Sequence, residues 1–171
     1  MGPGPLYAQA LPTPLEQGAY TVAGAGGVDV GSFGPVELAV PALLTVTTSL
    51  EAGTVVNRAD GLTLTWTGGS SDDIVVIHGR AFSIPDDAER PLREPMSFRS
   101  QGFLCATTAG AGEFAIPTYV LETLPDGLLT FNITHMPGEE DVARFEAAGL
   151  DEGGVFRWID TTAFLDLELQ P

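Results

Sequence analysis

Short stretches of alternating apolar and polar residues dominate this chain and constrain its fold more than any other feature. In residues 62–67, the order Leu-Thr-Leu-Thr-Trp-Thr puts the apolar side chains on one face and the threonines on the other, as in a half-buried β-strand. Similar stretches predict further strands at 19–23, 36–40, 43–48, 54–57, 74–77, 98–106, 113–116, 128–134, 142–147 and 155–169. Glycine-rich turns separate them at short intervals. Many short strands with frequent turns predict an all-β, Ig-like β-sandwich.

Residues 117–124 are the one good helix candidate. Pro117 suits the first turn of a helix, and Pro125 stops the helix after a few residues. We therefore expect a single short helical turn that crosses between the two sheets.

The length of 171 residues fits one domain with an extension. We expect a single sandwich domain at 15–171 and an N-terminal arm at 1–14, which is rich in proline and glycine. Residues 80–99 carry four of the seven arginines and three prolines, and they predict a long proline- and arginine-rich loop. Four acidic residues balance the charge of this segment, so the whole formal charge of −16 lies outside it.

The charge and the missing residue types exclude several functions. Acidic residues outnumber basic ones 23 to 7, so the chain repels phosphate backbones and we expect no nucleic-acid partner. No apolar run approaches the roughly 20 residues of a membrane span, so we expect no membrane insertion. Because all seven bases are arginine, Schiff-base and P-loop chemistry are excluded. The single cysteine, Cys105, excludes an intramolecular disulfide and is expected to be a small core residue.

Catalytic motifs are weak in this sequence. There is no Gly-x-Ser-x-Gly elbow. Of the two histidines, His78 is expected to be half-buried at a strand end and His135 to lie in a loop. We therefore predict no catalytic residues and a protein that is not an enzyme. A hydrolase that uses both histidines is the least favoured alternative.

Acidic pairs and triples are the main candidates for a metal site, whereas Asp29, after a glycine-rich turn, is expected to accept backbone hydrogen bonds. They occur at 72–73, 86–87 and 139–141, without the D-x-D-x-D-G spacing of a calcium loop. A solvated acidic surface is the favoured interpretation. We expect no cofactor and no metal ligand, with calcium as the remaining candidate.

Several segments resemble a domain that recurs in predicted secreted proteins of environmental bacteria. They include LEQGAYTV at 15–22, GAGGVDVGSF at 24–33, LTLTWTGG at 62–69, FLC at 103–105, GEFAIP at 112–117 and GLD at 149–151. The resemblance covers about residues 15–155, and that domain is an uncharacterised Ig-like β-sandwich. It implies an extracellular or cell-surface location and no reaction. The expected core includes Trp66, Phe103, Cys105 and Phe114.

Self-association is the function that the sequence favours. The arginine-bearing loop suits docking on an acidic neighbour, and the arm is apolar. The expected subunit contacts are Leu6, Tyr7, Leu11, Arg80, Arg90, Arg93 and Arg99. The alternating run 161–169 either forms an exposed sheet edge, which could accept an added strand, or covers the edge of its own domain. These features predict a homo-oligomer or polymer, such as a filament or surface-layer component.

A glycan- or ligand-binding accessory module is the alternative function. Binding of sugar rings on a β-sandwich depends on exposed aromatic side chains. Trp66 and Trp158 are the largest candidates, but both alternate with other apolar residues and are expected in the core.

Overall fold

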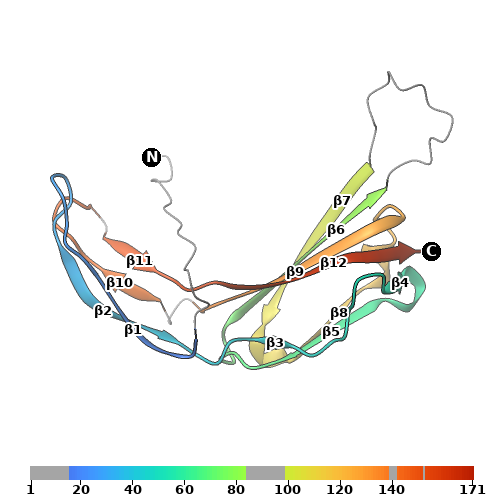
Figure 1. Ribbon diagram of the computed structural model, residues 1–171, viewed down its shortest axis with the longest axis horizontal. Helices are drawn as coiled ribbons and strands as arrows, with labels where there is room; N and C mark the ends of the chain where they lie inside the picture. The colour runs from blue at the N-terminus through green and yellow to red at the C-terminus, as the bar shows by residue number, and fades with distance from the viewer. Residues whose placement is uncertain (1–15, 84–98, 139–141, 152) are drawn as a thin grey trace, which may run out of the picture.

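A five-stranded sheet forms the largest part of the computed structural model, which describes residues 16–83, 99–138, 142–151 and 153–171 (Figure 1). Its strand order is β4–β12–β9–β6–β7. In that order, the strands span Val55–Asn57, Asp160–Gln170, Gly127–Met136, Ile74–Ser83 and Arg99–Thr108. Neighbours are antiparallel, except that β12 and β4 are parallel.

A three-stranded sheet covers one face of this large sheet. Its order is β3–β5–β8, with strands at Thr45–Val46, Leu62–Thr67 and Glu113–Ile116. Alternate residues of both sheets meet in one apolar core, as the period of two requires. The core includes Leu64, Trp66, Ile77, Phe131 and Ile133. We call these two sheets and their core the main lobe, and they confirm the predicted all-β, sandwich-like fold.

The helical turn α1, Thr118–Leu121, connects β8 in the small sheet to β9 in the large one, as the sequence predicted. Arg58, in the 3₁₀ turn Arg58–Asp60, holds the end of this helix. Its Nε and Nη2 donate to the carbonyl oxygens of Leu121 and Leu124 at 3.1 and 2.9 Å. Its Nη1 also pairs with the carboxylate of Asp126. The guanidinium therefore satisfies carbonyl groups that the short helix leaves without partners.

Two hairpins form a second, smaller group of strands, which we call the side lobe. One pairs β1, Gly18–Gly24, with β2, Phe33–Val40, and the other pairs β10, Ala143–Phe145, with β11, Gly154–Phe156. Their shared core contains Leu38, Val40, Ala143 and Trp158. The side lobe extends from one end of the main lobe and makes the molecule long and curved (Figure 1).

The far end of the side lobe is held together by three aromatic rings. Phe145 stacks on Phe33 and Phe156, with ring centroids 4.2 and 5.0 Å apart. Glycine makes this stacking possible, because a Cβ at Gly24 or Gly154 would collide with the rings of Phe33 or Phe145.

Three sequence expectations for individual elements were wrong. The run 155–169 is divided between β11 and β12, and only Thr45–Val46 of the run 43–48 is a strand. The loop expected at 80–99 is shorter, because β6 continues to Ser83 and β7 begins at Arg99. Residues 84–98 and the expected arm at 1–14 lie outside the described residues.

The C-terminal run does not form an exposed edge along its whole length. Residues 168–170 of β12 pair with β4 on one side, and residues 167–169 pair with β9 on the other. The alternative of a free C-terminal edge was therefore wrong for this half of β12. The run covers the edge of its own sheet, which was the other interpretation left open.

Candidate functional site

The junction between the lobes contains the most unusual polar cluster of the described residues. His135, next to last in β9, and Asp73, immediately before β6, are 1% and 0% exposed. His135 Nε2 lies 2.9 Å from Asp73 Oδ2. The backbone N–H of Leu44 donates to His135 Nδ1 at 3.3 Å, and that of Ser70 donates to Asp73 Oδ2 at 2.7 Å. Because Nδ1 accepts a hydrogen bond, the ring proton is assigned to Nε2, which donates to the carboxylate.

The glycine turn after β5 positions this cluster. Gly69 has a φ of +75°, which favours glycine, and its N–H donates to the carbonyl oxygen of Ala42 at 2.7 Å. A Cβ on Gly69 would lie 2.8 Å from the Cβ of Ala109 and 2.9 Å from His135 Nε2. Both the backbone conformation and the close approach therefore require glycine here.

Trp158 connects this polar cluster to the side lobe. Its ring belongs to the side-lobe core and lies edge-on to the imidazole of His135, with ring centroids 4.6 Å apart at 67°. His135 thus contacts three parts of the molecule: the carboxylate of Asp73 in the main lobe, the backbone of Leu44 just before β3, and Trp158 in the core of the side lobe. The cluster fixes the position of one lobe relative to the other.

A buried histidine–aspartate pair is also part of a hydrolase triad, but this geometry does not suit that chemistry. In a triad, the aspartate holds one ring nitrogen and the other faces the nucleophile. Here both ring nitrogens of His135 have protein partners, and the ring is buried. The imidazole has no nitrogen left to act as a general base, so the geometry supports a structural role.

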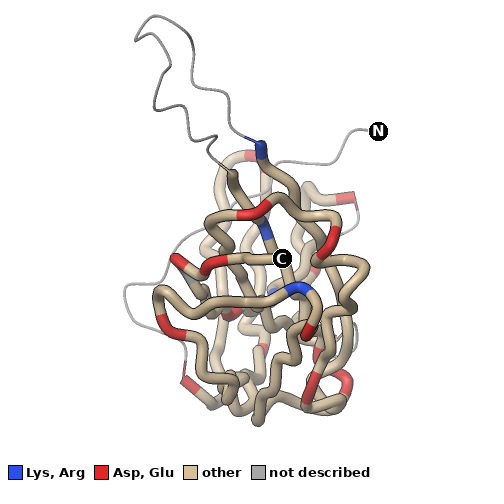
Figure 2. Tube along the Cα trace, turned by 90° about the vertical axis from the view of Figure 1, so that its right-hand side faces the viewer, with Lys and Arg blue, Asp and Glu red and all other residues tan. Residues whose placement is uncertain are grey.

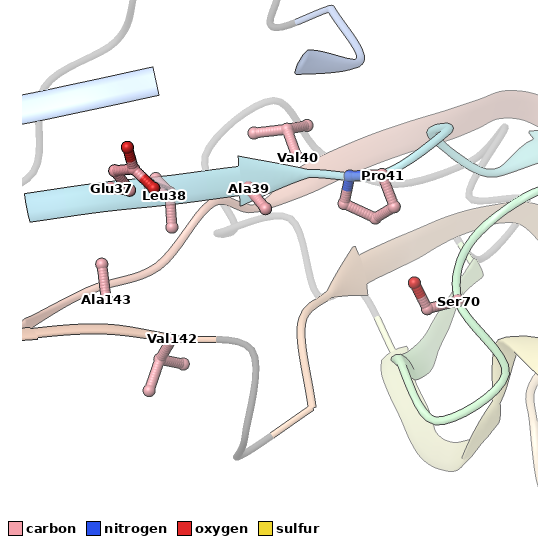
Figure 3. A pocket seen from close by; sticks show the side chains of 8 residues that line it. All are labelled: Glu37, Leu38, Ala39, Val40, Pro41, Ser70, Val142 and Ala143. Carbon is pink, nitrogen blue, oxygen red and sulfur yellow. The ribbon is translucent and has the colours of Figure 1, made fainter. Parts of the chain in front are cut away.

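A cavity of about 330 Å³ lies beside the junction (Figure 3). It is lined by Glu37, Leu38, Ala39, Val40, Pro41, Ser70, Val142 and Ala143. Most of these side chains are apolar, and β2 carries the single ionisable one, Glu37. Among the described residues that line the cavity, no set of polar side chains converges as a substrate site requires.

The outer side of the β6–β7 hairpin forms a second hollow, of about 490 Å³. Here Arg80 Nε donates to Ser100 Oγ at 2.9 Å, and its guanidinium lies 4.7 Å from the ring centre of Phe82. His78 is exposed in the middle of β6, so its expected half-buried place at a strand end was wrong. Leu104, opposite His78 on β7, is 68% exposed.

The expected contact residues divide into two groups. Arg80 and Arg99 are exposed on β6 and β7. The others, Leu6, Tyr7, Leu11, Arg90 and Arg93, lie outside the described residues. Of the expected core residues, Trp66 lies in the main core, while Phe103, Cys105 and Phe114 are partly buried and pack against it. Burial raises the pKa of the Cys105 thiol.

Sequence reasoning missed the junction pair, although a signal was present. His135 was expected in a loop, which was wrong, because β9 continues to Met136. Extending the alternation by one residue puts His135 on the face of Phe131 and Ile133, both buried. The same alternation, extended one residue before β6, puts Asp73 on the face of Val75, which is also buried.

Metal and membrane signals are absent from the part of the chain that the structure describes. No three His, Cys, Asp or Glu residues gather there in a way that could hold a metal ion. Residues 86–87 and 139–141, two of the acidic groups considered from sequence, lie outside it. Within the described ranges, no helix is long and apolar enough to cross a membrane.

Comparison with known proteins gives no relative for this arrangement. No family model, curated protein or solved structure matches the chain.

Proposed function

We propose that this protein is a non-catalytic structural subunit that associates with copies of itself outside the cell, in a filament or surface layer. The observation that carries the proposal is the charge of the two strands β6 and β7. The strands Ile74–Ser83 and Arg99–Thr108 contain two arginines and no acidic residue, in a chain of charge −16.

The charge distribution favours contact along these strands. Acidic positions are distributed over the rest of the body (Figure 2). Two copies that meet elsewhere therefore bring carboxylates together, which disfavours association. Two copies that meet along the strands β6 and β7 avoid this repulsion, because these strands carry no acidic residue. Arg80 and Arg99 also belong to the contact set expected from sequence.

The extracellular part of the proposal rests on the resemblance of residues 15–155 to a domain of predicted secreted proteins. We also propose from this resemblance that the sandwich is Ig-like. The glycan-binding alternative has less support, because Trp66 and Trp158 are 3% and 2% exposed and cannot form a surface platform.

The molar mass in solution tests this function. Light scattering behind size-exclusion chromatography, over a rising protein concentration at physiological salt, should give masses above the 17.9 kDa of one chain. A chain lacking residues 1–14 shows whether the arm contributes. A full-length protein that stays monomeric at the highest concentration reached would overturn the proposal.

A further inference from the structure

One edge of the five-stranded sheet is unusually open to pairing. Among the described residues, β7 pairs with β6 alone, through ten consecutive residue pairs without a bulge. Native sheets protect such edges with proline, charge, a bulge or short length. In β7, the only charge is Arg99 at its first residue, and there is no proline.

The other described strands with a single neighbour present less edge. β4 has three residues and β8 has four. β1 and β2 have seven and eight, but their register shifts between Val22 and Gly24, and β2 contains Pro35 and Glu37. β7 is therefore the longest regular strand edge in the part of the chain that the structure describes.

We propose that β7 of one copy pairs antiparallel with β7 of a second copy, across a two-fold axis at Leu104, and joins two five-stranded sheets into one of ten strands. This inference rests on the proposed self-association and names its contact. Main-chain hydrogen bonds along the two edges supply the attraction, as in other cases of strand addition.

The placement of the axis follows from the faces of β7. Opposed residues in an antiparallel pair point to the same side of the sheet, so a two-fold axis must pass between two copies of one residue. Leu104 lies near the middle of β7 on the outer face. Pairing it with its own copy buries an exposed leucine against a leucine. On the inner face, Phe103 then lies opposite Cys105 of the second copy, and both already pack on the core.

The charges fit this two-fold pairing. Arg99 lies at one end of β7, five residues before Leu104. In an antiparallel pair centred on Leu104, the two copies of Arg99 stand at opposite ends, about 34 Å apart at ~3.4 Å per residue. No acidic residue of either β7 enters the contact. The pairing thus keeps like charges far apart.

The N-terminal arm is a poorer occupant of this edge than a second β7. It carries prolines at positions 3, 5, 12 and 14. Proline has no N–H to donate to a ladder of hydrogen bonds. The longest proline-free run of the arm, 6–11, is shorter than β7. The ten residues of β7 contain no proline, and the β7 strand of a second copy has the same length.

Opposite charges at position 104 test the pairing. Leu104→Glu sets two carboxylates opposite each other at the axis and should raise the dissociation constant about tenfold or more. Leu104→Arg should weaken self-pairing in the same way. An equimolar mixture of the two variants should recover association, because glutamate then faces arginine. The matched control is Tyr119→Glu, since Tyr119 is also 68% exposed and lies on α1.

A disulfide reports the register directly. In the double variant Leu104→Cys with Cys105→Ala, the two new thiols face each other with Cα atoms about 4.5–5.5 Å apart, within reach of a disulfide. Mild oxidation should give a covalent dimer with Leu104→Cys and none with Tyr119→Cys, each in the Cys105→Ala background. Equal cross-linking of both variants would contradict the pairing.

The outcomes separate the two proposals. A monomeric wild-type chain removes both. Association that the position-104 variants leave unchanged, or that only deletion of residues 1–14 abolishes, removes the β7 contact and leaves self-association standing. Loss in both single variants, with recovery in their mixture, supports both.

Discussion

The main lobe and the side lobe are both built of antiparallel hairpins, but they differ in how much they bury. Among the described residues, sixteen buried residues form the core of the main lobe, and four form that of the side lobe. Because each large apolar side chain contributes about 1.5–3 kcal/mol when buried, only the main lobe has a core able to support itself. Isolated two-stranded hairpins are marginally stable in water. The side lobe therefore depends on the junction for its order.

The two tryptophans make this difference measurable. Trp66 lies in the main core and Trp158 in the side-lobe core. A chain with Trp158→Phe reports on the main lobe by fluorescence, and a chain with Trp66→Phe reports on the side lobe. Each variant below can be followed in both backgrounds.

The largest expected effect is that of Phe131→Ala. Phe131 is fully buried between the sheets and contacts the ring of Phe103, with centroids 5.9 Å apart. Removing it should lower the free energy of unfolding by about 3–5 kcal/mol. In urea titrations, the midpoints of both tryptophan signals should move to lower urea together, because the side lobe does not stay folded once the main lobe has unfolded.

Phe145→Ala is the matched change in the side lobe. Phe145 is only partly buried, so we expect a smaller cost, about 1–2 kcal/mol. The Trp158 signal should change at lower urea than the Trp66 signal. Coincident transitions in this variant would show that the lobes unfold as one unit.

Asp73→Ala should have the second largest effect, between those of Phe131→Ala and Phe145→Ala, because it removes the carboxylate of the junction. The change leaves the buried donor His135 Nε2 and the partly buried Ser70 N–H without their acceptor. An unpaired buried donor costs about 1–3 kcal/mol, so the loss should be about 2–4 kcal/mol. Thermal unfolding followed at Trp158 measures it.

Asp73→Asn is the control for this substitution. Its amide oxygen can take the place of Oδ2 and accept both hydrogen bonds, but its NH2 group replaces Oδ1, which is buried with no hydrogen-bond partner among the described residues. Asp73→Asn should therefore recover part of the stability that Asp73→Ala loses. A larger loss in Asp73→Asn than in Asp73→Ala would mean that the acceptor at Oδ2 does not hold the junction.

Which parts of the fold could be predicted from sequence depends on whether they are local. Alternation at 62–67 and the prolines around α1 act over a few residues, so β5 and the helical turn were predicted correctly. Strand order is set by pairing between distant segments. Nothing in residues 168–170 distinguishes an edge strand from one between β9 and β4, so the sequence left both alternatives open, and the pairing with β4 excludes the exposed edge there.

The junction shows the same limit at the level of residue types. Aspartate is usually exposed and histidine is intermediate in burial, so residue type alone does not place them in a core. They can be buried here because each meets the other and a backbone N–H, although Asp73 Oδ1 is buried with no hydrogen-bond partner among the described residues. These contacts join segments that are distant in the sequence, so they are a tertiary property. The one sign of their burial in the sequence is that His135 and Asp73 each stand two positions from a residue on the buried face of the strand.

Gly79→Ala should have an intermediate effect confined to the main lobe. Gly79 is buried in β6, and a Cβ there would collide with the ring of Phe103 and lie 2.8 Å from that of Phe131. Overpacking of this kind costs about 1–3 kcal/mol. Gly18→Ala, in the side lobe, meets nothing within 4 Å and should change stability by less than about 0.5 kcal/mol. Urea midpoints of the two variants, with equal slopes, give the comparison.

The smallest expected effect concerns Cys105 on β7. Burial raises the pKa of its thiol, so at a given pH the folded chain holds less thiolate than the unfolded chain. Alkylation by iodoacetamide should be slower in the folded state, with its pH midpoint above that in urea. Because the unfolded thiol ionises first, stability should fall slightly as the pH rises past the usual thiol range.

A cysteine at position 155 of β11, made by Val155→Cys in a Cys105→Ala chain, gives the side-lobe comparison. Val155 is 48% exposed, so this thiol should react faster than Cys105. Equal rates would show that β7 opens as readily as the side lobe, and the contrast between the lobes would then fail at this strand.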